Sequence, residues 1–552
     1  MDNLALNTYP ETAESATALT PNMQALLADK EPVQNLQPLG LTECIGGMAG
    51  TYPCNNVDLL SFMPLATIGG GSGNDVWGWT GCGNHNYALM GRTTGTSFVD
   101  ITDPVNPIYL GNLPPHTGSS IWRDIKTYND YAFIVSEAGG HGMQVFDLSQ
   151  LCNITNPPVT FAETTHYNGF GNAHNIVINE DTGYAYGVGT STCSGGLHMV
   201  NIQNPLTPTN AGCFSSDGYT HDAQCVIYDG LDTQHVGKEI CFNANEDTLT
   251  IVDVTNKAAP VQLSRTGYAG SSYTHQGWIT DDHAYFLLDD EGDETSNGHN
   301  TRTYIWNLAD LDSPNLIGNY TASVAAIDHN MYVRGNYVFQ ANYRAGLRIL
   351  DISDVANANL FEEAFFDIYP SSNSANFNGS WSTYPYFDNG VVLISGIEQG
   401  LFIVQPTTIP IISPPSCKTP AEVPWLNVSP TSGSTAENSS SSVNIGFNST
   451  GLTPGQYTAS LCLSSNAVTT PELFIPVTMT VSLPPEIEIT SPLSGTLFTA
   501  LNGVNITTTI TVTTPNFTVP DDGHWHLWVD GIDTGPAMTY TQPVTLSVGT
   551  HV

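Results

Sequence analysis

A unit of three short strands recurs through about the first 400 residues of the chain, and this repetition constrains the fold more than any other feature. In the copy at residues 328–353, a His-Asn pair starts the first strand, a Gly-Asn turn follows, and the second strand ends at Asn342. The third strand alternates over residues 346–352 and stops at a turn with two Asp residues. A fourth strand fits after such a turn, as at residues 108–113. Four strands per unit, repeated around a ring, predict a β-propeller.

The number of units follows from the polar residue that ends each third strand. Successive copies lie 44 to 54 residues apart, at Asp100, Asp147, Asn201, Asp253, Asn307, Asp351 and, more weakly, Gln405. Seven copies predict seven blades. The last copy has no fourth strand, whereas residues 57–63, before the first copy, have fourth-strand character. We expect this segment to pair with the blade that ends at Val404, which closes the ring and removes its open edges.

The 552 residues are too many for one ordinary domain. We predict an all-β chain, in which a seven-bladed β-propeller is followed by two small immunoglobulin-like β-sandwich domains. The predicted parts are an N-terminal arm (1–55), the propeller (56–406), a Pro-rich linker (407–416), a first sandwich (417–483) and a second, truncated sandwich (484–552).

The charge balance excludes some partners. Lys and Arg total 12 against 51 Asp and Glu, which gives a net charge of −39. Nucleic acid and anionic membrane surfaces both require a basic footprint, so neither fits this chain. There is no apolar run long enough to span a bilayer. The balance suits an acidic, exported protein.

The cysteines point to an oxidising compartment. Their number is ten, and none forms a metal-type Cys-x-x-Cys pair. We predict disulfides Cys44–Cys54, Cys193–Cys213, Cys225–Cys241 and Cys417–Cys462, and assign no partner to Cys82 or Cys152. No signal peptide is visible, so we expect a mature exported chain that has lost its leader, and a natural polypeptide that continues past residue 552.

Three short motifs resemble a known family: residues 47–50 (Gly-Met-Ala-Gly), 118–124 (Gly-Ser-Ser-Ile-Trp-Arg-Asp) and 346–351 (Gly-Leu-Arg-Ile-Leu-Asp). With the repeats, they look like the bacterial choice-of-anchor B proteins with LVIVD-type repeats, over about residues 44–406. The resemblance implies secretion and attachment to the cell surface through a variable C-terminal anchor, and it supplies no activity. The segment 417–483 is similar to BACON-type bacterial immunoglobulin-like modules, which serve as spacers or bind glycans.

The residues most suited to chemistry begin the first strands. Histidines occupy the same position in four consecutive units: His174, His221, His275 and His329. The second unit has Arg123 there, and the first and seventh have aromatic residues nearby (Trp77 or Trp79, and Trp381). First strands are innermost in a propeller, so this position lines one mouth of the channel, where the loops after the second strands also emerge. We predict a ligand-binding rim of Arg123, His174, His221, His275, His329 and Arg344, and assign no catalytic residue.

Carboxylates in one of these loops predict a metal site at Asp289, Asp290, Glu291 and Asp293. Hard oxygen ligands suit calcium, which is the first choice of ion, and imidazoles suit a transition metal, which is the second. The alternative is structural, because histidines that tie neighbouring blades together would recur at the same position for packing alone.

The sequence therefore predicts a secreted, surface-attached binding or structural protein with a ligand or cation site at the channel mouth. Its expected partner is an extracellular glycan or a surface protein. One alternative is a polysaccharide hydrolase or lyase that uses the rim histidines as acid and base. Another is a subunit of an extracellular filament or surface layer, which assembles as a homo-oligomer through the sandwich domains.

Overall fold

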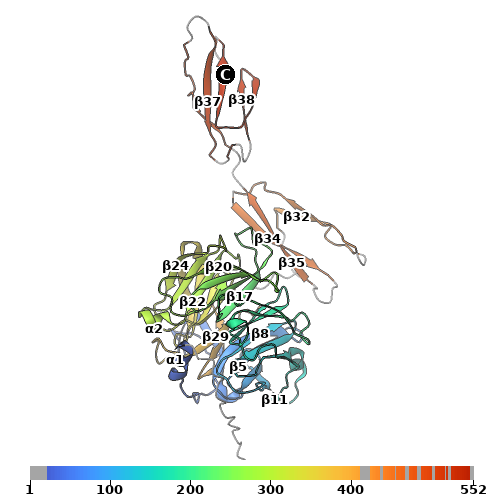
Figure 1. The fold of residues 1–552 in the computed structure, drawn as a ribbon, viewed down its shortest axis with the longest axis vertical. Helices are drawn as coiled ribbons and strands as arrows, with labels where there is room; N and C mark the ends of the chain where they lie inside the picture. The colour runs from blue at the N-terminus through green and yellow to red at the C-terminus, as the bar shows by residue number, and fades with distance from the viewer. Residues whose placement is uncertain are drawn as a thin grey trace, which may run out of the picture. The chain divides into compact units, whose positions relative to one another are not determined.

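The computed structural model describes residues 21–410, 423–435, 439–453, 455–465, 472–481, 486–499, 504–515, 518–519 and 524–547. The chain divides into two compact units, Met1–Ser413 and Pro414–Val552. The described parts of both are built almost entirely from β-strands (Figure 1). No helix among these residues combines the length and apolar character needed to cross a membrane.

The described part of the first unit contains seven sheets, each built on four antiparallel strands, and two of them carry additional strands. The first sheet has β4 (Gly73–Gly81), β5 (His85–Arg92), β6 (Gly95–Asp100) and β7 (Ile108–Leu113), with β11 (Val159–Thr160) added in parallel to β7. The second has β8 (Arg123–Tyr128), β9 (Tyr131–Ser136), β10 (Met143–Asp147) and β12 (Thr165–Tyr167). The third has β13 (Asn175–Asn179), β14 (Tyr184–Val188), β15 (His198–Asn201) and β16 (Thr209–Cys213).

The remaining four sheets repeat this order. They are β17 (Asp222–Ile227), β18 (Glu239–Ala244), β19 (Leu249–Asp253) and β20 (Val261–Thr266); then β21 (Thr274–Ile279), β22 (Tyr285–Asp290), β23 (Arg302–Asn307) and β24 (Asn315–Thr321). The sixth has β25 (Asn330–Arg334), β26 (Tyr337–Ala341), β27 (Leu347–Asp354) and β28 (Asn359–Phe366), extended by β2 (Tyr52–Asn55) and β1 (Met48–Ala49). The seventh has β29 (Ser380–Tyr384), β30 (Val392–Gly396), β31 (Gly400–Pro406) and β3 (Val57–Pro64).

Short helices connect or cover the sheets. The α-helices are α1 (Pro21–Asp29) and α2 (Asp293–Asn297), and the 3-10 turns are η1 (Leu65–Thr67), η2 (Leu148–Asn153), η3 (Cys193–Gly195) and η4 (Val355–Asn357).

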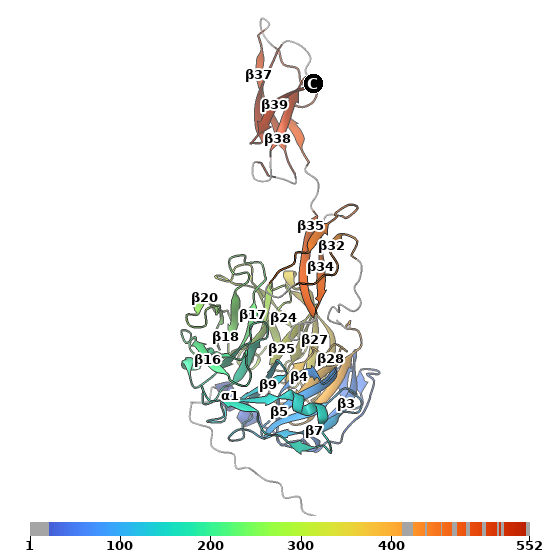
Figure 2. The same ribbon diagram turned by 90° about the vertical axis from the view of Figure 1, so that its right-hand side faces the viewer.

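The first strands of the seven sheets face a common centre. In order they are β4, β8, β13, β17, β21, β25 and β29; each contacts the next, and β29 contacts β4. Figure 2 shows the strands of the first unit from a second side, from β16 and β20 at one edge to β3 and β28 at the other. This arrangement is β-propeller-like. Apolar side chains fill the spaces between sheets; for example, Phe98 and Phe146 from neighbouring sheets stack with centroids 4.7 Å apart.

The seventh sheet is completed by a strand from the N-terminal side of the chain. β3 runs antiparallel to β31, with Leu59 opposite Val404 and Phe62 opposite Phe402. The two phenylalanine rings stack with centroids 4.3 Å apart, and both are buried. The prediction that residues 57–63 pair with the strand ending at Val404 is confirmed.

Side chains join the first strands to one another. First strands of neighbouring sheets form no backbone ladder, so their polar backbone groups need other partners. The residue after the histidine position supplies several of these partners. Asp75 accepts the N–H of Ile125 (3.1 Å), and Asp124 accepts the N–H of Ile176 (2.7 Å). Gln276 exchanges two bonds with Met331 (2.9 and 3.1 Å), and Asn175 donates to the carbonyl of His221 (3.1 Å).

Four disulfides lie in the first unit. The predicted pairs Cys44–Cys54, Cys193–Cys213 and Cys225–Cys241 are confirmed, and Cys82 pairs with Cys152, which the sequence left unassigned. Cys417, the predicted partner of Cys462, lies outside the described residues. Four disulfides indicate folding in an oxidising compartment, such as the periplasm or the extracellular space.

The described residues of the second unit form small antiparallel sheets. β32 (Leu426–Ser429) pairs with β33 (Asn444–Phe447), and β34 (Gly455–Ser464) pairs with β35 (Glu472–Val481). Further along, β36 (Glu488–Ser491), β37 (Ile506–Thr513) and β40 (Thr541–Leu546) form one sheet, and β38 (Trp525–Val529) pairs with β39 (Ile532–Ala537). The assignment of these strands to two immunoglobulin-like domains remains a prediction.

Candidate functional site

The four predicted histidines form a continuous row at the start of the first strands. Ring centroids are 4.3 Å apart for His174 and His221, 4.2 Å for His221 and His275, and 4.4 Å for His275 and His329. All four side chains are buried. Trp381 continues the row at 5.0 Å from His329, as expected for the seventh unit.

The hydrogen bonds of the row fix the state of two rings. His221 Nδ1 donates to the carbonyl of His275 (3.0 Å), and His329 Nδ1 donates to the carbonyl of Trp381. A carbonyl oxygen can only accept, so the proton is on Nδ1 and the lone pair is on Nε2. Burial lowers the pKa of His221 well below 6.5 and that of His329 to about 3. These imidazoles are therefore neutral, which is the form that binds metal ions.

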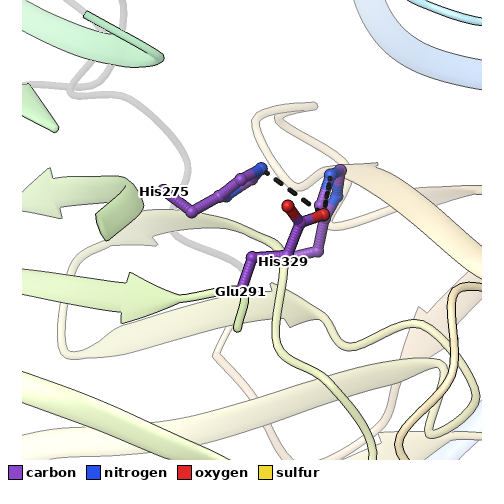
Figure 3. A group of neighbouring side chains, drawn as sticks. All are labelled: His275, Glu291 and His329. Atoms are coloured by element: carbon purple, nitrogen blue, oxygen red, sulfur yellow. Dashed lines mark ion pairs between the residues drawn. The ribbon is translucent and has the colours of Figure 1, made fainter. Parts of the chain in front are cut away.

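Glu291 reaches the row from the loop after β22. Its Oε1 lies 3.9 Å from His275 Nε2 and 3.7 Å from His329 Nε2 (Figure 3). Tyr343 Oη donates to the same oxygen (2.6 Å). Behind the row, His275 Nδ1 contacts Asp289 at 3.1 Å. The facing ligand atoms of His275, Glu291 and His329 could hold a metal ion, with Asp289 in the outer position that orients a ligating histidine.

Helix α1 covers this mouth of the channel. Met23 and Leu26 are buried against the aromatic and histidine side chains, which leaves a cavity of about 10 Å³. This is room for one water molecule or ion. At the last residue of the helix, Asn376 donates to the Asp29 side chain (2.8 Å) and Asn378 to the Asp29 carbonyl (2.9 Å). Figure 1 shows α1 in dark blue against the sheets of the first unit. The histidines of the predicted ligand-binding rim are thus covered, because part of the predicted arm folds onto them.

The other predicted rim residues lie elsewhere. Arg123 is buried between the first two sheets, where Nε donates to the carbonyl of Arg92 (3.2 Å) and Nη1 contacts His141 (3.0 Å). Arg344 stays near the covered mouth but turns away from the histidines; it bonds to Asn378 (3.0 Å) and lies 3.6 Å from Glu31, just after α1. The position equivalent to the histidines in the first unit is Asn74, not Trp77 or Trp79, which line the opposite part of the channel.

The four residues of the predicted metal site make different contacts. Asp289 contacts His275, and Glu291 faces the histidines. Asp290 accepts the backbone N–H groups of Ser272 (2.9 Å) and Tyr273 (2.6 Å), so it shapes the loop before β21. Asp293 begins α2 and belongs to a different group of carboxylates.

This second group combines Asp293 and Glu294 with Asp328, which directly precedes His329. One oxygen of each lies within 4.8 Å of the others, and all three residues are buried. One oxygen of Asp293 and both oxygens of Glu294 and Asp328 have no hydrogen-bond partner. Burial and neighbouring carboxylates raise the pKa of Asp293 to about 6 and that of Glu294 to about 10. The metal site predicted from the sequence included neither Glu294 nor Asp328, although the place of Asp328 beside a repeated histidine was a usable signal.

A third cluster lies apart from the channel row. Asp232, His235 and Asp312 have ligand atoms within 4.8 Å of one another, but Asp312 is exposed. His235 lies 3.4 Å from Asp312 and 3.8 Å from Asp232, so the imidazole and the two carboxylates already contact each other.

The chain shows family and structural similarities. Residues 242–266 and 329–364 match the LVIVD repeat. No curated protein matches the sequence. A periplasmic gluconolactonase of Pseudomonas aeruginosa is similar at 9% identity over 53% of this chain and 83% of its own, with a TM-score of 0.37. A functionally unknown protein of Desulfotomaculum acetoxidans is similar at 11% identity over 55% and 88%, with a TM-score of 0.38. A Lactobacillus plantarum protein is similar at 11% identity over 55% and 85%, with a TM-score of 0.39.

Proposed function

We propose that this is a secreted, surface-attached binding protein of the choice-of-anchor B kind, whose LVIVD-repeat propeller holds a structural cation. The seven sheets with cyclic first-strand contacts support seven blades over residues 56–406. The four disulfides support secretion. In this proposal, residues 1–55 are an arm, 407–416 a linker, and 417–483 and 484–552 two immunoglobulin-like modules that carry the propeller towards an extracellular glycan or surface protein.

The main support for a bound cation comes from the group of three carboxylates formed by Asp293, Glu294 and Asp328. Five of its six oxygens are buried without hydrogen-bond partners. Among the described residues, no Lys or Arg forms an ion pair with any of the three. The sixth oxygen, Asp293 Oδ2, accepts from Tyr304 (2.6 Å) and lies 3.5 Å from His299 Nε2. Ionised carboxylates that are buried with so few donors are destabilising, and a hard divalent cation relieves this cost. Oxygen-only ligands favour calcium. A transition metal suits the second position, between His275, Glu291 and His329.

The covered mouth favours a binding function over the enzymatic alternative. A hydrolase or lyase that uses the rim histidines must admit a polysaccharide beside them, whereas the cavity under α1 holds about one water molecule or ion. A filament or surface-layer subunit remains compatible with the proposal, because assembly through the second unit does not involve the channel.

Elemental analysis and calorimetry of the purified protein test the cation. We expect bound calcium and a fall in Tm on chelation. Restoring free calcium to about 100 times its Kd should raise the free energy of unfolding by about 2.7 kcal/mol and bring Tm back. Calcium must displace protons from carboxyl groups whose pKa is raised, so its effect on Tm should grow between about pH 6 and pH 9.

Asp328→Asn separates ion binding from packing. The substitution removes one of three crowded carboxylates, so the chelated variant should be at least as stable as the chelated wild type while its calcium response is lost. Asp388→Asn makes the same change at an exposed site and should keep the full response. Absence of bound metal, with a Tm indifferent to calcium and zinc, would refute the cation site.

A further inference from the structure

A second, larger cavity lies inside the ring, beyond the histidine row. Its volume is about 610 Å³, within the range of small-molecule sites. Later residues of all seven first strands line it, and it shares no lining residue with the small cavity under α1. No role in the cation site involves this space.

Aromatic rings dominate one side of this channel cavity. Trp77 lies 5.6 Å from Tyr332 and 5.1 Å from Tyr384, both edge to face. Trp278 packs against Tyr332 at 4.9 Å, and Tyr386 packs against Tyr384 at 5.5 Å. Trp278, Tyr384 and Tyr386 are only partly buried, so part of each ring faces the cavity.

The strand beside these rings is shaped to admit them. A Cβ atom on Gly78 would fall 2.1 Å from the Tyr384 ring, so only glycine lets this ring lie against β4. Two consecutive sheets, the sixth and the seventh, supply the tyrosines, and the first and the fifth supply the tryptophans. The aromatic wall therefore exists only in the assembled ring.

A positive charge already sits on this wall. Lys126 Nζ lies 4.5 Å from the centre of the Trp77 ring, and it bonds to Asp124 (2.7 Å) and pairs with Asp75 (3.5 Å). The π face of Trp77 thus stabilises an ammonium group inside the protein. Because Lys126 is held by two carboxylates, it adds little net positive charge to the cavity.

The remaining charges are acidic. Glu180, Asp181 and Asp281 lie at the exposed edge of the cavity, and Asp222, whose pKa burial raises to about 7, lines its interior. Lys126 is the one Lys or Arg among the lining residues, and burial lowers the pKa of the nearby His283, which keeps it neutral. An anionic ligand would face carboxylates on several sides, whereas a cation would be attracted, further helped by the net charge of −39.

We propose that the channel cavity binds a small organic cation with an alkylated ammonium group, held against Trp77, Trp278 and the tyrosines and attracted by the carboxylates at the edge. Aromatic walls with nearby acid groups recognise such ligands because alkyl groups pack on the rings while the charge interacts with their π faces. This site goes beyond the proposed structural cation, and the two can fail independently.

The proposal is tested by titrating choline into the full chain and measuring binding by calorimetry and by tryptophan fluorescence. Its neutral isostere 3,3-dimethylbutan-1-ol is the matched control, because it has the same shape without the charge. We expect choline to bind saturably and roughly tenfold more tightly than the isostere, which corresponds to the cation–π contribution. Equal binding of both compounds, or no binding of choline, would overturn the proposal. Saturable binding of a neutral sugar that choline does not displace would also overturn it.

Variants assign the binding to the aromatic wall. Trp278→Leu removes a partly buried ring and should weaken choline binding about tenfold, while Trp278→Phe should restore most of it. Both variants should unfold in one cooperative thermal transition near the wild-type Tm, which shows that the ring has folded whether or not calcium binds. Unchanged choline affinity in a folded Trp278→Leu protein would place the binding elsewhere and overturn the proposal.

Discussion

The imidazoles of His221 and His329 pack between neighbouring sheets, and their orientation is also the one that a metal ligand needs. Each donates Nδ1–H to a backbone carbonyl of the neighbouring first strand, at His275 and Trp381 respectively. These bonds tie adjacent sheets together, as the structural alternative for the repeated histidines requires. They also leave Nε2 as an acceptor, and for His329 this atom faces Glu291. The two interpretations are therefore compatible in the same residue.

Acid should destabilise the fold through His329. The unfolded imidazole takes up a proton below about pH 6.5, whereas burial lowers the pKa of the folded one to about 3. The contribution of the neutral His329 to the free energy of unfolding is complete above pH 6.5 and is lost as the pH falls from 6.5 towards 3. Between about pH 6.5 and pH 4.5 the loss is about 2–3 kcal/mol. Urea unfolding at both pH values should show a smaller acid loss for His329→Gln than for the wild type; equal losses would contradict the assignment.

Lys257 and Lys238 offer a second residue-level comparison. Lys257 Nζ lies 2.6 Å from Glu239, both buried, whereas Lys238 Nζ lies 3.4 Å from Asp253 and is 38% exposed. Lys257→Met leaves a buried carboxylate without its cation, so we expect a loss of about 3–5 kcal/mol in the free energy of unfolding. Lys238→Met should cost less than about 1 kcal/mol. Similar losses in denaturant titrations of the two variants would show that burial does not decide the effect.

At the scale of elements, α1 controls access to the histidine row. Its buried contacts are few, Met23 and Leu26 on a nine-residue helix, so it should detach more easily than any sheet. Leu26→Asp places a charge in this apolar contact and should make the four histidines reactive towards diethyl pyrocarbonate. Ala28→Asp makes the same change on the exposed side and should leave them protected. Equal protection in both variants would mean that α1 does not cover the row in solution.

Elements with a regular period could be predicted from the sequence, and elements defined by distant contacts could not. The repeated third strand predicted the sheets. The segment 57–63, which has fourth-strand character but precedes the first unit, predicted how the ring closes. Helix α1 is too short and too weakly amphipathic to stand out. Glu294, in α2, meets Asp328, which precedes β25, and Cys82 and Cys152 meet because the first two sheets are neighbours. Tyr332 and Tyr384 follow the alternation of ordinary core residues, so the aromatic cavity left no distinct signal.

For the whole molecule, the net charge of −39 sets a general repulsion against which the fold must be stable. Salt shortens the Debye length from about 30 Å at 0.01 M to about 8 Å at 0.15 M ionic strength. We therefore expect Tm to rise with sodium chloride over this range, because repulsion within the compact state is screened. Calorimetry at matched ionic strength should show a further rise with calcium, which separates the specific site from screening. A Tm that falls with sodium chloride would show that attractive ion pairs outweigh the repulsion.

The antiparallel seam between β3 and β31 also determines how the ring responds to mechanical load. Val57 lies opposite Pro406, so the chain enters one strand and leaves the other at the same end of the seam, where the N–H of Thr407 donates to the carbonyl of Asn56 (2.8 Å). Tension between these two segments would open the seam like a zipper, breaking its bonds one at a time from this end. A pull on the chain that leaves at Thr407 is therefore applied first to this end of the seam, whereas the segment before Val57 is held by the pairing of β2 with β28 and by the Cys44–Cys54 bridge.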